Sequence, residues 1–215
     1  MSRPQLESDV RSAYDEVADS YADRFRSIEP EEAIDIAMIE HFGSLLQAPK
    51  KVLDAGCGAG RMLPVLAAMN CDVEGVDLSP GMVRRARRDH PSFTTTVASL
   101  TDLPFPDSCF DGYFSWYSTI HLPDSELPLV VDEVRRVLRP GGVALLAFQS
   151  GTGTRDVSEA YRRHGHDIVL ERYNRTADQV AAALSVGGLQ EVARLERSAV
   201  SPHERDGQAV VIAKV

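Results

Sequence analysis

Hydrophobic and polar positions follow two different patterns along this chain, and the first pattern covers the N-terminal segment. Apolar side chains recur at spacings of three and four residues between Ser8 and Phe25, which predicts an amphipathic helix. A second helix is expected from about Pro30 to Gln47, because Pro30 and Glu31 suit a first helical turn. The pair Ala48-Pro49 ends this helix, so a helical segment precedes the rest of the chain.

From residue 51 onward, short apolar runs alternate with helical stretches. The expected strands are Lys51–Ala55, Asp72–Asp77, Phe93–Val97, Phe110–Trp116, Val143–Phe148, Leu189–Arg197 and Gln208–Val215. The expected helices are Arg61–Met69, Pro80–Asp89 with Ser79 as its N-cap, Ser125–Leu138, and one from Thr176 to about Val186. Strands that alternate with helices indicate an α/β fold whose mostly parallel sheet is covered on both faces.

Composition and charge limit the classes of protein to consider. A chain of 215 residues with 43% hydrophobic and 26% charged residues fits a single globular domain. The formal net charge of −9 disfavours nucleic acid or an anionic membrane as the main partner. Apolar runs of about six residues are far shorter than the roughly 20 that span a bilayer. The polar N-terminus lacks a signal-peptide core, so we expect a soluble cytoplasmic protein, monomeric or homodimeric.

The main candidate for a binding site is the run Val52-Leu-Asp-Ala-Gly-Cys-Gly-Ala-Gly-Arg61, which lies between a predicted strand and a predicted helix. Glycines at 56, 58 and 60 let the backbone turn sharply and approach a ligand closely. Dinucleotide folds use such a turn to hold a pyrophosphate. Here Asp54 would repel a pyrophosphate, and it suits a cationic group such as the ammonium of an amino acid.

A second carboxylate, Asp77, ends the second predicted strand, 17 residues after Gly60. An acidic residue at this place can accept both hydroxyls of a ribose. The apolar residues Leu78 and Met82 follow and suit the face of an adenine. A ligand with an ammonium at one end, a ribose in the middle and adenine beyond is S-adenosylmethionine.

These motifs resemble those of the class I, Rossmann-like S-adenosylmethionine-dependent methyltransferases, and in particular the small single-domain type 11-like enzymes. The stretches Val52–Arg61 and Gly75–Met82 carry the resemblance. Two more stretches match in order: Leu103–Asp111 before the fourth strand, and Leu138–Gly142 before the fifth. The resemblance implies a three-layer α/β/α sandwich with a seven-stranded, mostly parallel sheet in the order 3-2-1-4-5-7-6, its last-placed strand antiparallel.

The resemblance also implies which residues contact the cofactor. The loop from Asp54 to Gly60 would lie under the methionyl part, with Asp77 on the ribose. The family often has a Gly-Asp pair for the adenine amino group, where this chain has Ala98-Ser99-Leu100. The hydroxyl of Ser99 and the amide of Leu100 are therefore the expected contacts. The full set of expected cofactor-binding residues is Tyr21, Asp54, Gly56, Cys57, Gly58, Gly60, Arg61, Asp77, Leu78, Met82, Ser99, Leu100 and Ser115.

The candidate residues for the methyl acceptor follow the fourth strand, in Ser115-Trp-Tyr-Ser-Thr-Ile-His121. Ligands of open parallel sheets bind beyond the carboxyl ends of the strands. Trp116 and Tyr117 are expected to form walls of the site, or else to pack in the core. His121 is expected to act as a general base or to bind the acceptor, or else to be a histidine at a helix entry. Tyr14 and Tyr21 on the first helix either contact the cofactor or pack in the core, and Tyr21 is the preferred contact.

The chain is expected to form one domain, 1–215, with four parts. These are an N-terminal helical cover (1–47), a cofactor-binding half (48–149), a candidate acceptor lid (150–175), and a C-terminal helix with a strand pair (176–215). The lid is rich in arginine, histidine and tyrosine, which suits an anionic small-molecule acceptor or else a solvated loop. The pair His164 and His166 has no accompanying ligand cluster, and the three cysteines have no zinc or redox spacing. No metal site is therefore expected.

The predicted function is transfer of a methyl group from S-adenosylmethionine to oxygen, nitrogen or carbon of a small molecule by in-line displacement. Two alternatives remain open. One is an RNA or protein methyltransferase, although the chain has no basic stripe. The other is a non-catalytic module that binds S-adenosylmethionine or S-adenosylhomocysteine, because binding and turnover share the same motif residues. The glycine spacing and Asp54 disfavour an NAD-dependent oxidoreductase.

Overall fold

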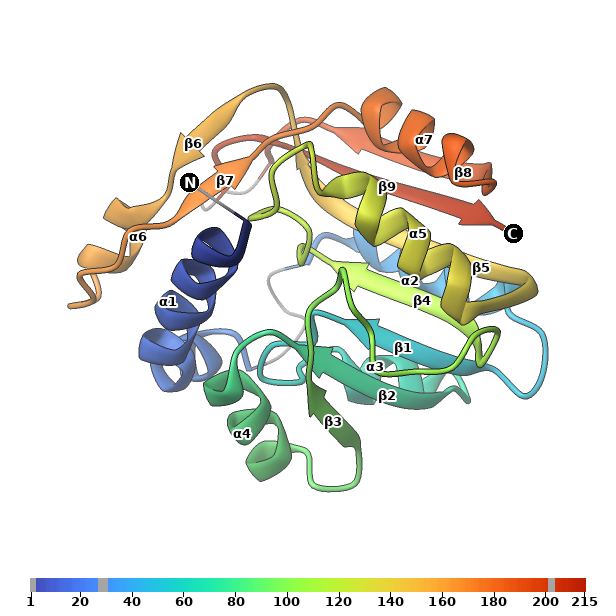
Figure 1. Cartoon of the computed structure of the whole chain (residues 1–215), viewed down its shortest axis with the longest axis horizontal. Helices are drawn as coiled ribbons and strands as arrows, with labels where there is room; N and C mark the ends of the chain where they lie inside the picture. Colours follow the sequence, from blue (N-terminus) through green and yellow to red (C-terminus); the bar gives the residue numbers. More distant parts are fainter. Residues whose placement is uncertain (1–2, 27–30, 201–203) are drawn as a thin grey trace.

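A seven-stranded sheet forms the centre of the structure, a computed structural model that describes residues 3–26, 31–200 and 204–215 (Figure 1). The strands lie in the order β3-β2-β1-β4-β5-β9-β8. Their bounds are β1 Lys51–Ala55, β2 Asp72–Asp77, β3 Thr94–Val97, β4 Phe110–Trp116, β5 Leu138–Ser150, β8 Gln190–Arg197 and β9 Gly207–Lys214. Strand β9 is antiparallel to β5 and β8, and β1 to β5 are parallel to one another. Because β6 and β7 lie outside this sheet, β8 and β9 are its sixth and seventh strands, and the predicted order is confirmed.

Helices cover both faces of the sheet, as the alternation of strands and helices predicts. Their bounds are α1 Arg3–Arg24, α2 Ala33–Leu45, α3 Leu63–Ala68, α4 Pro80–Asp89, α5 Leu127–Val137, α6 Ser158–Arg162 and α7 Ala177–Val186. Successive strand residues point to opposite faces. Leu53 and Tyr113 accordingly share a core with α5 and α7, whereas Val52 and Phe114 share a core with α2 and α3. None of the described helices is both long enough and apolar enough to cross a bilayer.

Several element boundaries differ from the sequence prediction. Strand β5 begins at Leu138, because its pairing with β4 steps from Phe110–Leu138 to Gly112–Val143 and leaves the predicted turn as an irregularity within the strand. Helix α2 begins at Ala33, and Pro30, the predicted start, lies outside the described residues. Helix α3 begins at Leu63, because Arg61 still belongs to the glycine-loop turn.

The segment predicted as a lid, 150–175, contains secondary structure that the sequence pattern did not reveal. Strands β6, Thr154–Asp156, and β7, Glu171–Tyr173, form an antiparallel ribbon, with α6 between them. Figure 1 shows this ribbon on one side of α1 and α4 on the other.

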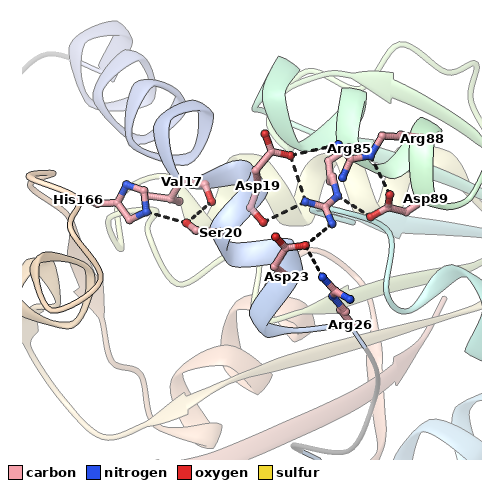
Figure 2. Close-up of polar contacts among 9 residues, drawn as sticks. All are labelled: Val17, Asp19, Ser20, Asp23, Arg26, Arg85, Arg88, Asp89 and His166. Atoms are coloured by element: carbon pink, nitrogen blue, oxygen red, sulfur yellow. Dashed lines mark hydrogen bonds and ion pairs between the residues drawn. The ribbon is translucent and has the colours of Figure 1, made fainter.

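Polar contacts hold α1 from both of these sides (Figure 2). The guanidinium of Arg85 in α4 is largely buried and pairs with Asp19 at 3.1 Å and Asp23 at 2.6 Å, both on α1. On the opposite side, the hydroxyl of Ser20 is 2.7 Å from Nε2 of His166. Helix α1 is therefore held between α4 and the segment after β6.

We predict that Arg85→Met loosens α1. The methionine keeps an apolar stem but removes the charge-assisted hydrogen bonds to both α1 carboxylates. Because both carboxylates are half or more exposed, the free energy of unfolding should fall only modestly. Amide hydrogen exchange in α1 should accelerate more than exchange in β1 or β4. Arg84→Met, at an exposed position of the same helix, is the matched control. Unchanged exchange in α1 would show that Arg85 does not hold the helix.

Candidate functional site

A cavity of about 840 Å³, open space included, lies at the carboxyl ends of the central strands beneath α1. Twelve of the candidate residues named from the sequence line it: Tyr14, Tyr21, Gly56, Gly58, Asp77, Leu78, Met82, Ser99, Leu100, Trp116, Tyr117 and His121. The structure thus brings eight of the thirteen predicted cofactor residues together with the predicted acceptor residues in one cavity.

The side chain of Asp77 is fixed between the glycine loop and the start of α4. The backbone N–H of Gly58 donates to Oδ2 of Asp77 at 2.9 Å, and that of Ser79 donates to Oδ1 at 2.9 Å. The loop reaches this position because Gly58 has a positive φ of 54°, and a Cβ at Gly56 would lie 2.1 Å from the side chain of Ser118. Each carboxylate oxygen has a further lone pair, so Asp77 can also accept hydroxyl groups of a ligand.

The side chain of Asp54 is buried below this loop, with 1% of its surface exposed, and does not line the cavity. Its Oδ2 has no hydrogen-bond partner among the described residues. Burial raises the pKa of Asp54 to about 7, although Arg61 opposes this shift. Burial also raises the pKa of Asp77 to about 6, in spite of the two N–H groups that it accepts. A ligand with a cationic group near Asp54, bound directly or through water, would supply the missing partner.

Together these two carboxyl groups fit S-adenosylmethionine, the cofactor that the sequence motifs imply. The orphaned oxygen of Asp54 suits an ammonium, and the fixed carboxylate of Asp77 suits vicinal hydroxyls. The cavity continues past Asp77 along the apolar side chains of Leu78 and Met82.

Four other predicted cofactor residues lie around the loop and not in the cavity wall. The thiol of Cys57 faces Gly75, where an added Cβ would be 2.8 Å from Sγ, and burial raises the pKa of the thiol. Gly60 packs toward α4, and Arg61 pairs with Glu31 at 2.6 Å. The hydroxyl of Ser115 contacts that of Ser118 at 2.6 Å. These residues shape the loop and its surroundings.

Two aromatic residues at the end of β4 form a wall of the cavity. The ring of Trp116 stacks on Phe114 with 5.7 Å between centroids and 5° between planes, and Tyr117 meets Trp116 edge-on. The indole Nε1 of Trp116 is buried and has no hydrogen-bond partner among the described residues. Buried N–H groups are nearly always paired, so this group is a donor available to a ligand.

His121 forms a hydrogen-bonded pair with Tyr14 of α1. Its Nδ1 is 2.6 Å from the carbonyl oxygen of Glu171, and its Nε2 is 2.8 Å from the hydroxyl of Tyr14. A carbonyl only accepts, so Nδ1 carries the proton and Nε2 accepts the hydroxyl of Tyr14. Burial lowers the pKa of His121 to about 4, which keeps the imidazole neutral near pH 7. Tyr161 of α6 also shares a hydrogen bond with Tyr14, so α1, β4 and the candidate lid meet here.

Five further residues that line the cavity were not predicted from the sequence. They are Leu6, Glu7 and Val10 from α1, and Leu122 and Glu126 from the segment after β4. Ser118, which lies within the predicted acceptor segment, lines the cavity as well. Helical spacing indicates which side of α1 is apolar, but it does not show that a glutamate on that helix turns toward the cavity. The acceptor segment was predicted to reach only to His121.

The basic side chains of the candidate lid do not line this cavity. Arg155 and Arg172 both pair with Asp206, and Arg175 is buried against Asp124 at 2.8 Å. His166 lies against Ser20 on α1. The lysines and arginines of the described residues are likewise absent from the lining, and these residues contain no group of three side chains suited to a metal ion.

Comparisons with known proteins agree with this geometry. Residues 52–142 match the family model described as a methyltransferase domain. The malonyl-[acyl-carrier protein] O-methyltransferase of Erwinia pyrifoliae is 32% identical over 138 residues, which cover 63% of this chain and 52% of that protein. Sterol methyltransferase-like 2 of Botryococcus braunii is 34% identical over 126 residues, which cover 55% of this chain and 31% of that protein. The chain thus spans about half or less of these relatives.

Among solved structures, the 1,6-didemethyltoxoflavin-N1-methyltransferase of Burkholderia thailandensis has a similar fold. Its crystal structure holds 1,6-didemethyltoxoflavin and S-adenosylhomocysteine, and the comparison gives a TM-score of 0.71 at 19% identity, covering 100% of this chain and 90% of that one. The chain thus has the fold of this solved methyltransferase, and its residues 52–142, which include the glycine loop and Asp77, match a methyltransferase domain.

Proposed function

We propose that this protein transfers a methyl group from S-adenosylmethionine to a small molecule. One observation supports the proposal above all: a single cavity is lined both by Asp77, which suits a ribose, and by the neutral Tyr14–His121 pair, which suits an acceptor. Helix α1 contributes five residues to the lining of this cavity, namely Leu6, Glu7, Val10, Tyr14 and Tyr21.

The residues around the glycine loop hold the cofactor in this proposal. Asp77 accepts the ribose hydroxyls, and Asp54 lies nearest to the ammonium. When bound, the cofactor supplies an electrophilic methyl group on sulfur, which in-line displacement transfers to a nucleophile. The aromatic wall of Trp116 and Tyr117 excludes water from this region and orients the acceptor.

Tyr14 and His121 accept the proton that the acceptor loses. The hydroxyl of Tyr14 donates to His121 Nε2, and its oxygen also accepts the hydroxyl of Tyr161, which leaves one lone pair for an O–H or N–H group of the acceptor. During methyl transfer, the oxygen of Tyr14 would take the acceptor's proton while the phenol's own proton passes to Nε2. His121 would then be an imidazolium, whose positive charge replaces the one that leaves the cofactor. Nδ1 keeps its proton on the carbonyl of Glu171 throughout.

The part of the acceptor that enters the cavity carries no negative charge in this proposal, because no lysine or arginine of the described residues lines the cavity. An anionic portion of the acceptor, for which the basic residues of segment 150–175 gave a reason, would have to lie outside this cavity. Arg155, Arg172 and Arg175 of that segment already pair with Asp206 and Asp124.

Binding of S-adenosylhomocysteine tests the proposed function. Calorimetry should give a dissociation constant of micromolar order for the unaltered protein. Asp77→Ala removes two charge-assisted hydrogen bonds and should weaken binding by about 30-fold or more. Asp72→Ala, at the exposed start of the same strand, is the control and should bind normally. Failure of the unaltered protein to bind would refute the function, and normal binding by Asp77→Ala would remove the ribose assignment.

Binding should also depend on pH. The buried carboxyl of Asp54, with a pKa of about 7, is mostly protonated in acid, whereas a bound ammonium favours the carboxylate. Affinity for S-adenosylhomocysteine should therefore rise from pH 5.5 to 7, and binding should release protons. Asp77 contributes to the same rise, because its raised pKa also leaves part of it protonated at pH 5.5. Calorimetry in two buffers of different ionisation enthalpy measures the released protons. Asp54→Asn should flatten the dependence, and an equal slope in both proteins would contradict the assignment.

The Tyr14–His121 pair predicts a specific kinetic effect. A screen with labelled S-adenosylmethionine identifies an acceptor, and Tyr14→Phe and His121→Ala are then compared on it. Loss of general base catalysis should lower kcat by about 100-fold or more for an acceptor that must lose a proton. Affinity for S-adenosylhomocysteine should stay within about twofold, since neither side chain holds the cofactor in this proposal. Unchanged kcat in both variants would exclude the proton relay.

A further inference from the structure

The carboxylate of Glu7, in α1, lines the same cavity as Asp77. It lies at the end of the cavity where the chain leaves β3. The hydroxyl of Ser99 donates to Oε1 of Glu7 at 2.5 Å, and that of Thr101 lies 3.5 Å from the same oxygen. The N–H of Thr101 in turn donates to the Ser99 hydroxyl at 3.2 Å. A carboxylate 92 residues away in the sequence is thus held against the loop after β3.

The register of the sheet fixes where this end lies relative to Asp77. Asp77 is paired with Val97 on β3, and the N–H of Ala98 donates to the carbonyl of Asp77 at 3.0 Å. Ser99 and Leu100 therefore follow directly beside the end of β2. The cavity leads from the Asp77 carboxylate along apolar side chains to the oxygens of Ser99 and Glu7.

This arrangement suits a flat base attached to a ribose on Asp77. Leu78, Met82 and Leu100 provide apolar surface for the faces of the base. The edge of the base would then meet a carboxylate. Because a carboxylate accepts hydrogen bonds and cannot donate them, this end favours a base whose edge carries an N–H donor.

We propose that Glu7 recognises the exocyclic amino group of the adenine, an inference that rests on the proposed function. A carboxylate has about four acceptor sites, and the hydroxyls of Ser99 and Thr101 leave it capacity for another donor. If a base carried a carbonyl oxygen at this position, that oxygen would face the carboxylate of Glu7. Both groups are acceptors, so no hydrogen bond could form. Sites built to hydrogen-bond a donor discriminate strongly against analogues that lack it. Helix α1 then contributes to cofactor specificity in addition to covering the site.

The contact would also stabilise the first half of α1. The described ion pairs of Arg85 and the contact of His166 involve Asp19, Ser20 and Asp23, all in its second half. An adenine bound to Glu7 would add a second link, through the ligand, to the hydrogen bond that already joins this half to the loop after β3. Ligand-dependent protection of residues 6–14 is therefore a readout that a purely structural glutamate would not give.

The test compares S-adenosylhomocysteine with S-inosylhomocysteine, in which an oxygen replaces the amino group. The unaltered protein should prefer the adenine ligand by about tenfold or more in calorimetry. Glu7→Gln can donate to the oxygen of hypoxanthine, so this preference should fall below about threefold. S-adenosylhomocysteine should slow hydrogen exchange in residues 6–14 of the unaltered protein and much less in Glu7→Gln. Asp9→Asn removes the same charge at an exposed position of α1 and should behave as the unaltered protein does.

Three results of this comparison would count against a proposal, and they can be told apart. A Glu7→Gln protein that folds, as its thermal unfolding shows, and keeps the full preference for adenine would overturn the role of Glu7. An unaltered protein that binds both ligands equally would do the same while leaving the proposed function intact. Failure of the unaltered protein to bind either ligand would instead refute the proposed function.

Discussion

The site depends on how the carboxylate of Asp77 is held. One of its oxygens accepts the N–H of Gly58 and the other that of Ser79, so one side chain connects the loop after β1 to the turn between β2 and α4. Both oxygens are thereby oriented before any ligand arrives. Burial disfavours the charged form of these side chains. It raises the pKa of Asp77 to about 6 and that of the nearby Asp54 to about 7. Two such carboxyl groups are stable in a site that a cationic, hydroxyl-bearing ligand completes.

Helix α1 contributes more to this site than its description as a cover suggests. Glu7, Val10, Tyr14 and Tyr21 follow one another at helical spacings and all line the cavity. Asp19 and Asp23 instead face α4, where Arg85 holds them. The same helix therefore anchors itself with one set of side chains and presents another set to the ligand. In the proposed reaction, one helix contacts the cofactor at Glu7 and the acceptor at Tyr14.

The fold and the cofactor half of the site could be predicted because their signals are local in sequence. The glycine loop and Asp77 lie within short motifs, and apolar runs define the strands of the sheet. The pairing of Tyr14 with His121 spans 107 residues, so no local pattern reveals it. Glu7 was missed for the same reason. The arginines of segment 150–175 suggested a site for an anion, but Arg155, Arg172 and Arg175 pair with Asp206 and Asp124, which are distant in sequence. The predicted roles of the individual site residues stay predictions until a ligand is bound.

A crystal structure of the protein with S-adenosylhomocysteine tests the central claim most directly. The account predicts that both ribose hydroxyls lie within hydrogen-bond distance of the Asp77 carboxylate. It also predicts the ammonium on the Asp54 side of the glycine loop, and the sulfur facing the wall of Trp116 and Tyr117. A ligand bound outside this cavity, or one whose ribose makes no contact with Asp77, would contradict the account.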